Sequence, residues 1–164
     1  SMVEDRFGLW VGTSGQGIYH WDGKRFKKRY LARDESLFDN VTALAFNHDH
    51  LYLGTDRGMY VFDGGSWATV STEEGLPSNL VTSIDASGWV VYVGTPGGLV
   101  SYFQREVSPV HKLNDRFVSV VRVDGRRIIA GTGRDGLVLK SGPAVTTLVN
   151  PWEEQDGSMA SLAH

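Results

Sequence analysis

The sequence contains no cysteine, which excludes disulfide bonds and thiolate-bound metal sites but leaves the cellular compartment open. It also has no apolar run near the roughly 20 residues that a membrane-spanning helix needs, so we expect no membrane insertion. Neither sign of charge dominates: 16 Lys and Arg stand against 19 Asp and Glu, a net charge of −3. This balance argues against a nucleic-acid-binding protein.

The composition that remains is that of a folded globular chain. Hydrophobic residues make up 41% and charged residues 21% of the 164 positions, which excludes wholesale disorder and fits one domain. The unusual count is 20 glycines, about 12% against a typical value of ~7%. Many tight turns are therefore expected.

A short phrase that ends in Gly-Thr occurs four times. Its glycines are Gly12, Gly54, Gly94 and Gly131, which are 42, 40 and 37 residues apart. Each phrase is followed by a short loop, a second glycine and an apolar run. In the last three copies a valine stands thirteen residues before the first glycine, at Val41, Val81 and Val118. So many coincidences indicate a true internal repeat.

Each unit is predicted to form four short strands, which in the second unit fall near 40–46, 51–55, 58–62 and 66–71. Asp124-Gly125 lies between two apolar runs, a strong signal for a two-residue hairpin. Inner strands such as 90–93 are apolar at consecutive positions, which is typical of strands buried on both faces. A repeat near 40 residues with these strands predicts an all-β propeller of four blades, each of four antiparallel strands. An ordinary sandwich with accidental similarity is the alternative.

The chain is predicted to be a single propeller domain, 1–164. Its units are about 1–37 plus 159–164, 38–77, 78–115 and 116–158. The first unit is predicted to start at its second strand, and the C-terminal residues 159–164 align with 41–46. We therefore expect 159–164 to supply the missing innermost strand of the first blade, so that one chain closes its own ring. The alternative is an eight-bladed ring of two chains, a homodimer in which each lends its last strand.

The segments Leu9–Gly17 and Gly75–Val81 resemble the two-component regulator propeller repeats. Gly75-Leu76-Pro77-Ser78-Asn79-Leu80-Val81 is similar to that family's linker between blades. The resemblance covers about nine tenths of the chain and implies the blade fold. It also implies a role like that of the extracytoplasmic sensor regions of bacterial histidine kinases, which detect ligands that are often carbohydrates. An extracytoplasmic or periplasmic location follows from the resemblance alone.

Few residues carry the signature of catalysis or of a metal. His48-Asp49-His50 has side chains that suit zinc or copper, but it falls in a link between strands, so an exposed turn and no metal are expected. No nucleophile elbow is present. The carboxylate pairs, which we expect to be hydrated groups in links between blades, are Asp34-Glu35, Glu73-Glu74 and Glu153-Glu154. We predict no enzyme activity and no cofactor.

Basic and aromatic side chains receive structural interpretations. The run 24–29 places five Lys and Arg on an outer strand, where lysine commonly prevents edge pairing; an acidic partner is the alternative. Trp10, Trp21 and Trp67 occupy repeated positions and are expected to pack between blades, and Trp89 is expected to behave similarly. Trp152 belongs to no repeated position and is a candidate for an exposed contact.

A ligand is expected on the rim where the loops between blades gather with those between second and third strands. Arg57 and Arg134, from different blades, are candidates for converging on an anionic or hydroxylated ligand, because guanidinium groups match planar oxygen pairs. The interpretation that we favour is that Asp56-Arg57 and Arg134-Asp135 form only surface ion pairs. The remaining predicted rim residues are Arg33, Glu73, Asp115, Arg116 and Trp152.

The sequence thus favours a non-enzymatic module that binds a small molecule, with a carbohydrate as one candidate, or a protein. Two other functions stay open. One is a carbohydrate-active hydrolase or lyase that uses rim carboxylates or a metal. The other is a structural unit that assembles into larger rings.

Overall fold

The computed structural model describes residues 1–29 and 40–149, which form sixteen strands and no helix. Within these ranges no helix is long and apolar enough to cross a membrane. The strands are β1 (Met2–Asp5), β2 (Gly8–Gly12), β3 (Ile18–Trp21), β4 (Phe26–Arg29), β5 (Val41–Asn47), β6 (His50–Thr55), β7 (Gly58–Phe62), β8 (Trp67–Val70), β9 (Ser83–Ser87), β10 (Val90–Thr95), β11 (Gly98–Phe103), β12 (Glu106–Pro109), β13 (Val118–Asp124), β14 (Arg127–Thr132), β15 (Gly136–Ser141) and β16 (Ala144–Val149).

These strands form four antiparallel sheets, each of four strands in chain order: β1–β4, β5–β8, β9–β12 and β13–β16. The predicted propeller of four blades is therefore confirmed, and the strands of the second unit agree with their predicted bounds to within one or two residues. The hairpin predicted at Asp124-Gly125 is present between β13 and β14.

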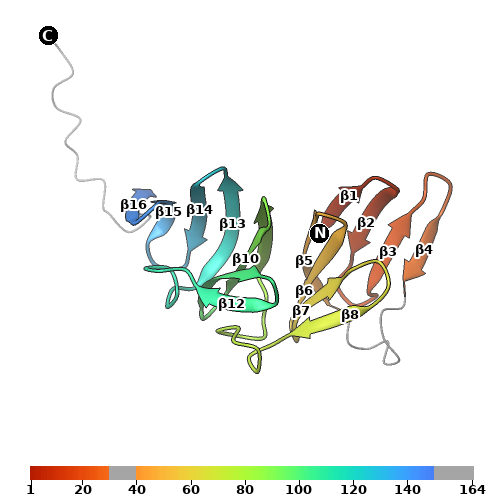
Figure 1. The fold of residues 1–164 in the computed structure, drawn as a ribbon, viewed down its shortest axis with the longest axis horizontal. Coiled ribbons are helices and arrows are strands. Elements are labelled where there is room, and N and C mark those ends of the chain that lie inside the picture. The colour runs from red at the N-terminus through yellow and green to blue at the C-terminus, as the bar shows by residue number, and fades with distance from the viewer. Residues whose placement is uncertain (30–39, 150–164) are drawn as a thin grey trace, which may run out of the picture.

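The four sheets stand side by side in an arc, with their first strands towards the inside (Figure 1). Neighbouring inner strands contact each other, β1 with β5, β5 with β9 and β9 with β13. The arc is open, because the first and fourth sheets lie at its opposite ends (Figure 1). Inner strands from all four sheets line a groove of about 430 Å³.

Three apolar cores lie between consecutive sheets, and the repeated glycines and valines meet in them. A Cβ built on Gly54 would lie 2.6 Å from Val81 Cγ1, and one built on Gly12 would lie 2.2 Å from Val41 Cγ1. Val81 is fully buried. The repeat therefore needs a glycine because the next sheet approaches its backbone closely, and the valine thirteen residues before the following glycine fills that place.

The threonine after the repeated glycine holds the turn to the third strand. Thr55 Oγ1 donates to the carbonyl of Gly58 at 2.9 Å and accepts from the amide of Arg57 at 2.9 Å. The corresponding hydroxyls of Thr13, Thr95 and Thr132 also donate to the glycine that opens the next strand. The Gly-Thr phrase thus combines a contact between sheets with a cap on a turn.

The expectation that the first unit lacks its own innermost strand is wrong. β1 pairs along β2, with Met2 opposite Val11 and Asp5 opposite Gly8, and so occupies the place predicted for 159–164. Val3 packs against the core between the first two sheets, and Asp5 accepts the indole hydrogen of Trp10 at 2.8 Å, which together fix the strand. The segment 159–164 itself lies outside the described residues.

Candidate ligand-binding pocket

A pocket of about 640 Å³ lies between the second and third sheets, at the ends of the strands that carry the β5–β6, β7–β8, β9–β10 and β11–β12 turns. We call it the aromatic pocket. Aromatic and polar side chains from both sheets line it: Asn47, His48, His50, Tyr52, Val61, Asp63, Ser66, Trp67, Ala68, Trp89, Tyr102, Phe103, Gln104 and Arg105. A concave site of this size with aromatic walls and a few polar groups is typical of small-molecule binding.

Trp89 forms an exposed aromatic platform at the mouth of the pocket. It follows Gly88 in the β9–β10 turn, and 67% of its surface is exposed. Its indole stacks on the imidazole of His48, with ring centroids 3.8 Å apart and planes 20° apart. Because His48 belongs to the second sheet and Trp89 to the third, the stack joins the two sheets at this edge.

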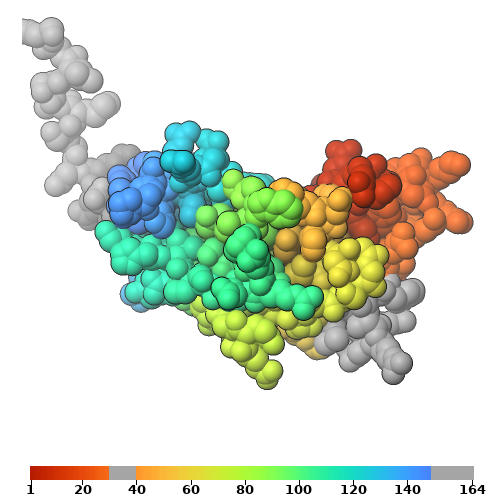
Figure 2. Space-filling view, viewed as in Figure 1, coloured from red at the N-terminus to blue at the C-terminus, as the bar shows by residue number. Residues whose placement is uncertain are grey.

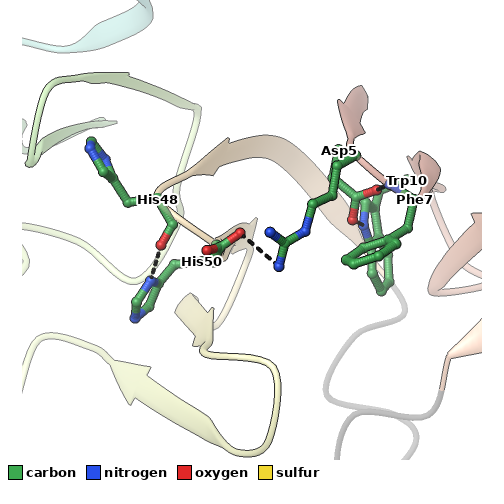
Figure 3. A network of polar contacts seen from close by, with 7 residues as sticks. Asp5, Phe7, Trp10, His48 and His50 are labelled. Atoms are coloured by element: carbon green, nitrogen blue, oxygen red, sulfur yellow. Dashed lines mark hydrogen bonds and ion pairs between the residues drawn. The ribbon is translucent and has the colours of Figure 1, made fainter.

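The turn that carries His48 is held from several sides. His48 and Asp49 both have positive φ, 47° and 62°, as a two-residue hairpin turn of type I′ requires. Asp49 pairs with Arg6 of the first sheet at 3.3 Å, and His50 Nδ1 donates to the carbonyl of His48 at 2.8 Å (Figure 3). The predicted exposed turn at 48–50 is thus confirmed. No group of three His, Asp or Glu able to hold a metal occurs within 1–29 and 40–149.

Two tyrosines form the inner wall. Tyr52 and Tyr102 meet edge to face, with ring centroids 6.3 Å apart, and both are buried. Burial raises the pKa of the Tyr52 hydroxyl, and the neighbouring Tyr102 adds to the effect. Burial likewise raises the pKa of Tyr102. Both hydroxyls therefore stay protonated at neutral pH and are able to donate or accept hydrogen bonds.

Charged and amide groups surround these rings. Asp63, in the β7–β8 turn, accepts hydrogen bonds from the amides of Ser66 at 2.7 Å and Gly65 at 2.9 Å, and from the Ser66 hydroxyl at 3.0 Å. These bonds, led by that from the Ser66 amide, lower the pKa of Asp63 to about 2. On the opposite sheet, Gln104 and Arg105 form the β11–β12 turn with positive φ at both residues. The pocket thus offers a permanent carboxylate, a guanidinium and an amide around aromatic faces.

The predicted rim residues are only partly brought together. A second hollow, of about 670 Å³, gathers Asp115, Arg116, Arg134 and Asp135 beside the fourth sheet. The predicted Arg134–Asp135 ion pair is replaced there, because Asp135 binds Arg116 at 2.7 Å.

Other predicted rim residues lie elsewhere. Asp56 accepts from the side-chain amide of Asn40 at 3.3 Å, and neither Asp56 nor Arg57 lines the second hollow. The Glu73 amide donates to Ser71 Oγ at 3.1 Å in the link after β8. Arg33 and Trp152 lie outside the described residues. A ligand site at this rim stays a prediction.

Of the tryptophans, Trp10 is buried and Trp67 packs against the first core, as expected. The expectation that Trp89 packs between blades is wrong, because a turn carries it into solvent. Sequence reasoning also passed over Tyr102 and Arg105 as ligand-binding candidates. For Trp89 a signal was available, because the sequence Ser-Gly-Trp between two strands places an aromatic residue in a hairpin turn.

Several solved structures share this fold. The extracellular domain of the putative hybrid two component system BT4673 from B. thetaiotaomicron has a TM-score of 0.73 and 24% identity over 91% of this chain and 22% of that one. The corresponding domain of BT3049 has a TM-score of 0.68 and 22% identity, covering 91% and 23%. The computationally designed Ika4 protein has a TM-score of 0.64 and 18% identity, covering 85% and 88%.

The chain therefore spans less than a quarter of the length of the two extracellular domains. At these identities the likeness shows the propeller fold alone. No protein-family model matches the chain, and no curated protein matches it.

Proposed function

We propose that this chain is a non-enzymatic, sensor-type propeller module that binds a carbohydrate in the aromatic pocket. The solved structures of similar fold include extracellular domains of two-component systems, and this supports both the sensor role and a location outside the cytoplasm. The repeated phrase supports a relationship to the two-component regulator propeller repeats. The observation that carries the proposal is the exposed face of Trp89 beside the polar groups of the pocket.

The chemistry of a sugar ring matches this arrangement. A pyranose presents C–H groups on its faces and hydroxyl groups around its edge. The first suit the apolar faces of Trp89 and Phe103, and the second suit Asp63, Gln104 and Arg105. In such pockets aromatic walls commonly hold the ring, and a few fixed polar groups select its hydroxyls.

The same residues argue against a glycosidase at this pocket. Hydrolysis of a glycosidic bond commonly needs two carboxyl groups, one of them protonated at neutral pH. Among the residues that line the pocket Asp63 is the sole carboxylate, and its pKa of about 2 keeps it ionised. Asp63 therefore suits hydrogen bonding to hydroxyls and does not suit proton donation.

The test is titration calorimetry of the purified chain with a panel of defined oligosaccharides of glucose, xylose, mannose and uronic acids. We expect saturable binding to at least one member, and its loss in Trp89→Ala. The matched control is Phe7→Ala, because Phe7 is also an exposed aromatic residue in a hairpin turn but lies outside the pocket. Equal binding by Trp89→Ala, or no binding in the panel, contradicts the proposal; release of shorter sugars would instead favour the enzyme.

A further inference from the structure

The first sheet carries a copy of a surface that is buried in the second sheet. The leading face of a sheet is the face turned towards the preceding sheet. In the second sheet it consists of Leu51, Leu53, Tyr60, Phe62 and Trp67, which pack against the first sheet. By register and by the repeat, the same positions on the first sheet are Leu9, Val11, Tyr19, Trp21 and Phe26.

The two leading faces match in detail. Phe62 and Trp67 stack with ring centroids 4.8 Å apart, and Trp21 and Phe26 contact each other at 4.9 Å. In the first sheet, however, Phe26 is 54% exposed. The leading face of the first sheet thus has the residues of a sheet–sheet contact without a partner sheet among the described residues.

The fourth sheet shows the complementary feature on its trailing face, which is turned away from the third sheet. In the second sheet this face includes Ala43, Tyr52, Met59 and Val61, all buried against the third sheet. The equivalent positions of the fourth sheet are Val120, Ile129, Leu137 and Leu139. These side chains are also apolar, yet Val120 is 47% exposed.

Every junction inside the chain joins a trailing face to the leading face of the next sheet. The two faces that have no partner sheet within residues 1–29 and 40–149 are therefore of the kinds that bind each other. They lie at opposite ends of the arc, where Figure 2 shows the first sheet in red and orange and the fourth in cyan and blue. We propose that a second copy of this chain brings them together. Two such contacts, related by a two-fold axis, would close an eight-bladed ring.

Charge supports this choice of occupant. At the junction of the third and fourth sheets, Asp85 accepts the amide of Val123 at 2.8 Å and lies 3.6 Å from Arg122. By strand register, Arg122 in the fourth sheet is equivalent to Asp85 in the third. Glu4 in the first sheet is likewise equivalent to Val123 in the fourth. The junction between copies would therefore bring Arg122 of one copy to Glu4 of the other, two exposed groups of opposite charge.

Ring closure would also complete the central groove. Its wall is formed by Ser1 to Val3 of the first sheet and by inner-strand residues of the other three sheets. In the ring the two grooves face each other across the two-fold axis and form one channel. The aromatic pocket lies within one chain, so ligand binding there does not depend on the ring.

The test is light scattering coupled to size-exclusion chromatography across a concentration series. The wild-type chain is expected at twice its 18.1 kDa mass. Arg122→Glu and Glu4→Arg should each weaken the dimer by about tenfold or more, and the double variant, which restores opposite charges at both junctions, should recover it. Circular dichroism melts confirm that each variant is folded.

An apolar variant supplies an independent reading. Phe26→Arg, on the leading face, should give a monomer, whereas Phe7→Arg, at an exposed aromatic residue in the β1–β2 turn, should stay dimeric. A wild-type chain that is monomeric at every concentration overturns the proposal. That result is expected if another segment or a different protein covers these faces. A dimer that none of these substitutions weakens, or an assembly larger than two copies, also overturns it.

Discussion

Val81 occupies the space that Gly54 leaves open in the preceding sheet. A Cβ on Gly54 would lie 2.6 Å from Val81 Cγ1 and 3.2 Å from Ala43 Cβ, and the Val81 amide donates to the carbonyl of Thr55 at 2.9 Å. The repeated glycine and the repeated valine are thus the two sides of one contact. This contact sets how closely consecutive sheets approach each other.

Gly54→Ala should destabilise the fold by about 1–3 kcal/mol, because the added methyl group must push the next sheet away from a packed core. The free energy of unfolding in guanidinium chloride measures the effect. Gly65→Ala is the matched control, since its Cβ would meet only Asp63 Oδ1 at 3.7 Å. Equal stability of the two variants would show that the approach of Val81 imposes no constraint.

Thr55→Val keeps the shape of the side chain but removes both hydrogen bonds of the buried hydroxyl. We expect a loss of about 1–3 kcal/mol, because the Gly58 carbonyl and the Arg57 amide lose their partner. Thr69→Val, at an exposed position of β8, should change stability by less than about 0.5 kcal/mol. Thermal unfolding of the two variants gives the comparison, and a loss of the same size in both would contradict the capping role of Thr55.

Asp63 should make the protein less stable in acid. Its pKa of about 2 lies below the ordinary value of 3.8, so the folded state favours the ionised carboxylate more than the unfolded chain does. The stabilisation is fully present above about pH 4 and is lost as the pH falls towards 2. Carboxyl carbon NMR should give a midpoint near 2, and Asp63→Asn should flatten the fall in melting temperature over that interval. A midpoint near 4 would contradict the hydrogen-bonded turn.

The strand pattern could be predicted from the sequence because each unit repeats the same contacts. Gly94 meets Val118 as Gly54 meets Val81, and each of these valines stands thirteen residues before the next repeated glycine, so a single structural solution explains all junctions. The strand β1 escaped prediction because its valine is followed by Glu4 and Asp5, and only Val3 packs against the core. Four residues with one such contact carry no clear pattern.

The aromatic pocket could not be predicted, because it depends on turns from two different sheets. His48 and Trp89 are 41 positions apart, and nothing in the spacing of either one indicates that their rings stack. The rim arginines were easier to find as charged loop residues. The ion-pair partners of these arginines could not be predicted, because Arg116 reaches Asp135 through the packing of two loops.

The central claim is that a carbohydrate binds at Trp89, and the side-chain Nε1–H signals of the tryptophans in a ¹⁵N-correlated NMR spectrum test it most directly. An oligosaccharide that binds in the calorimetric panel is titrated into the chain. The account predicts a saturable shift of the Trp89 indole signal, with backbone shifts at Gln104 and Arg105 and none at Arg134. Shifts confined to Arg116, Arg134 and Asp135, with the Trp89 signal unmoved, would contradict it and would place the ligand on the opposite rim.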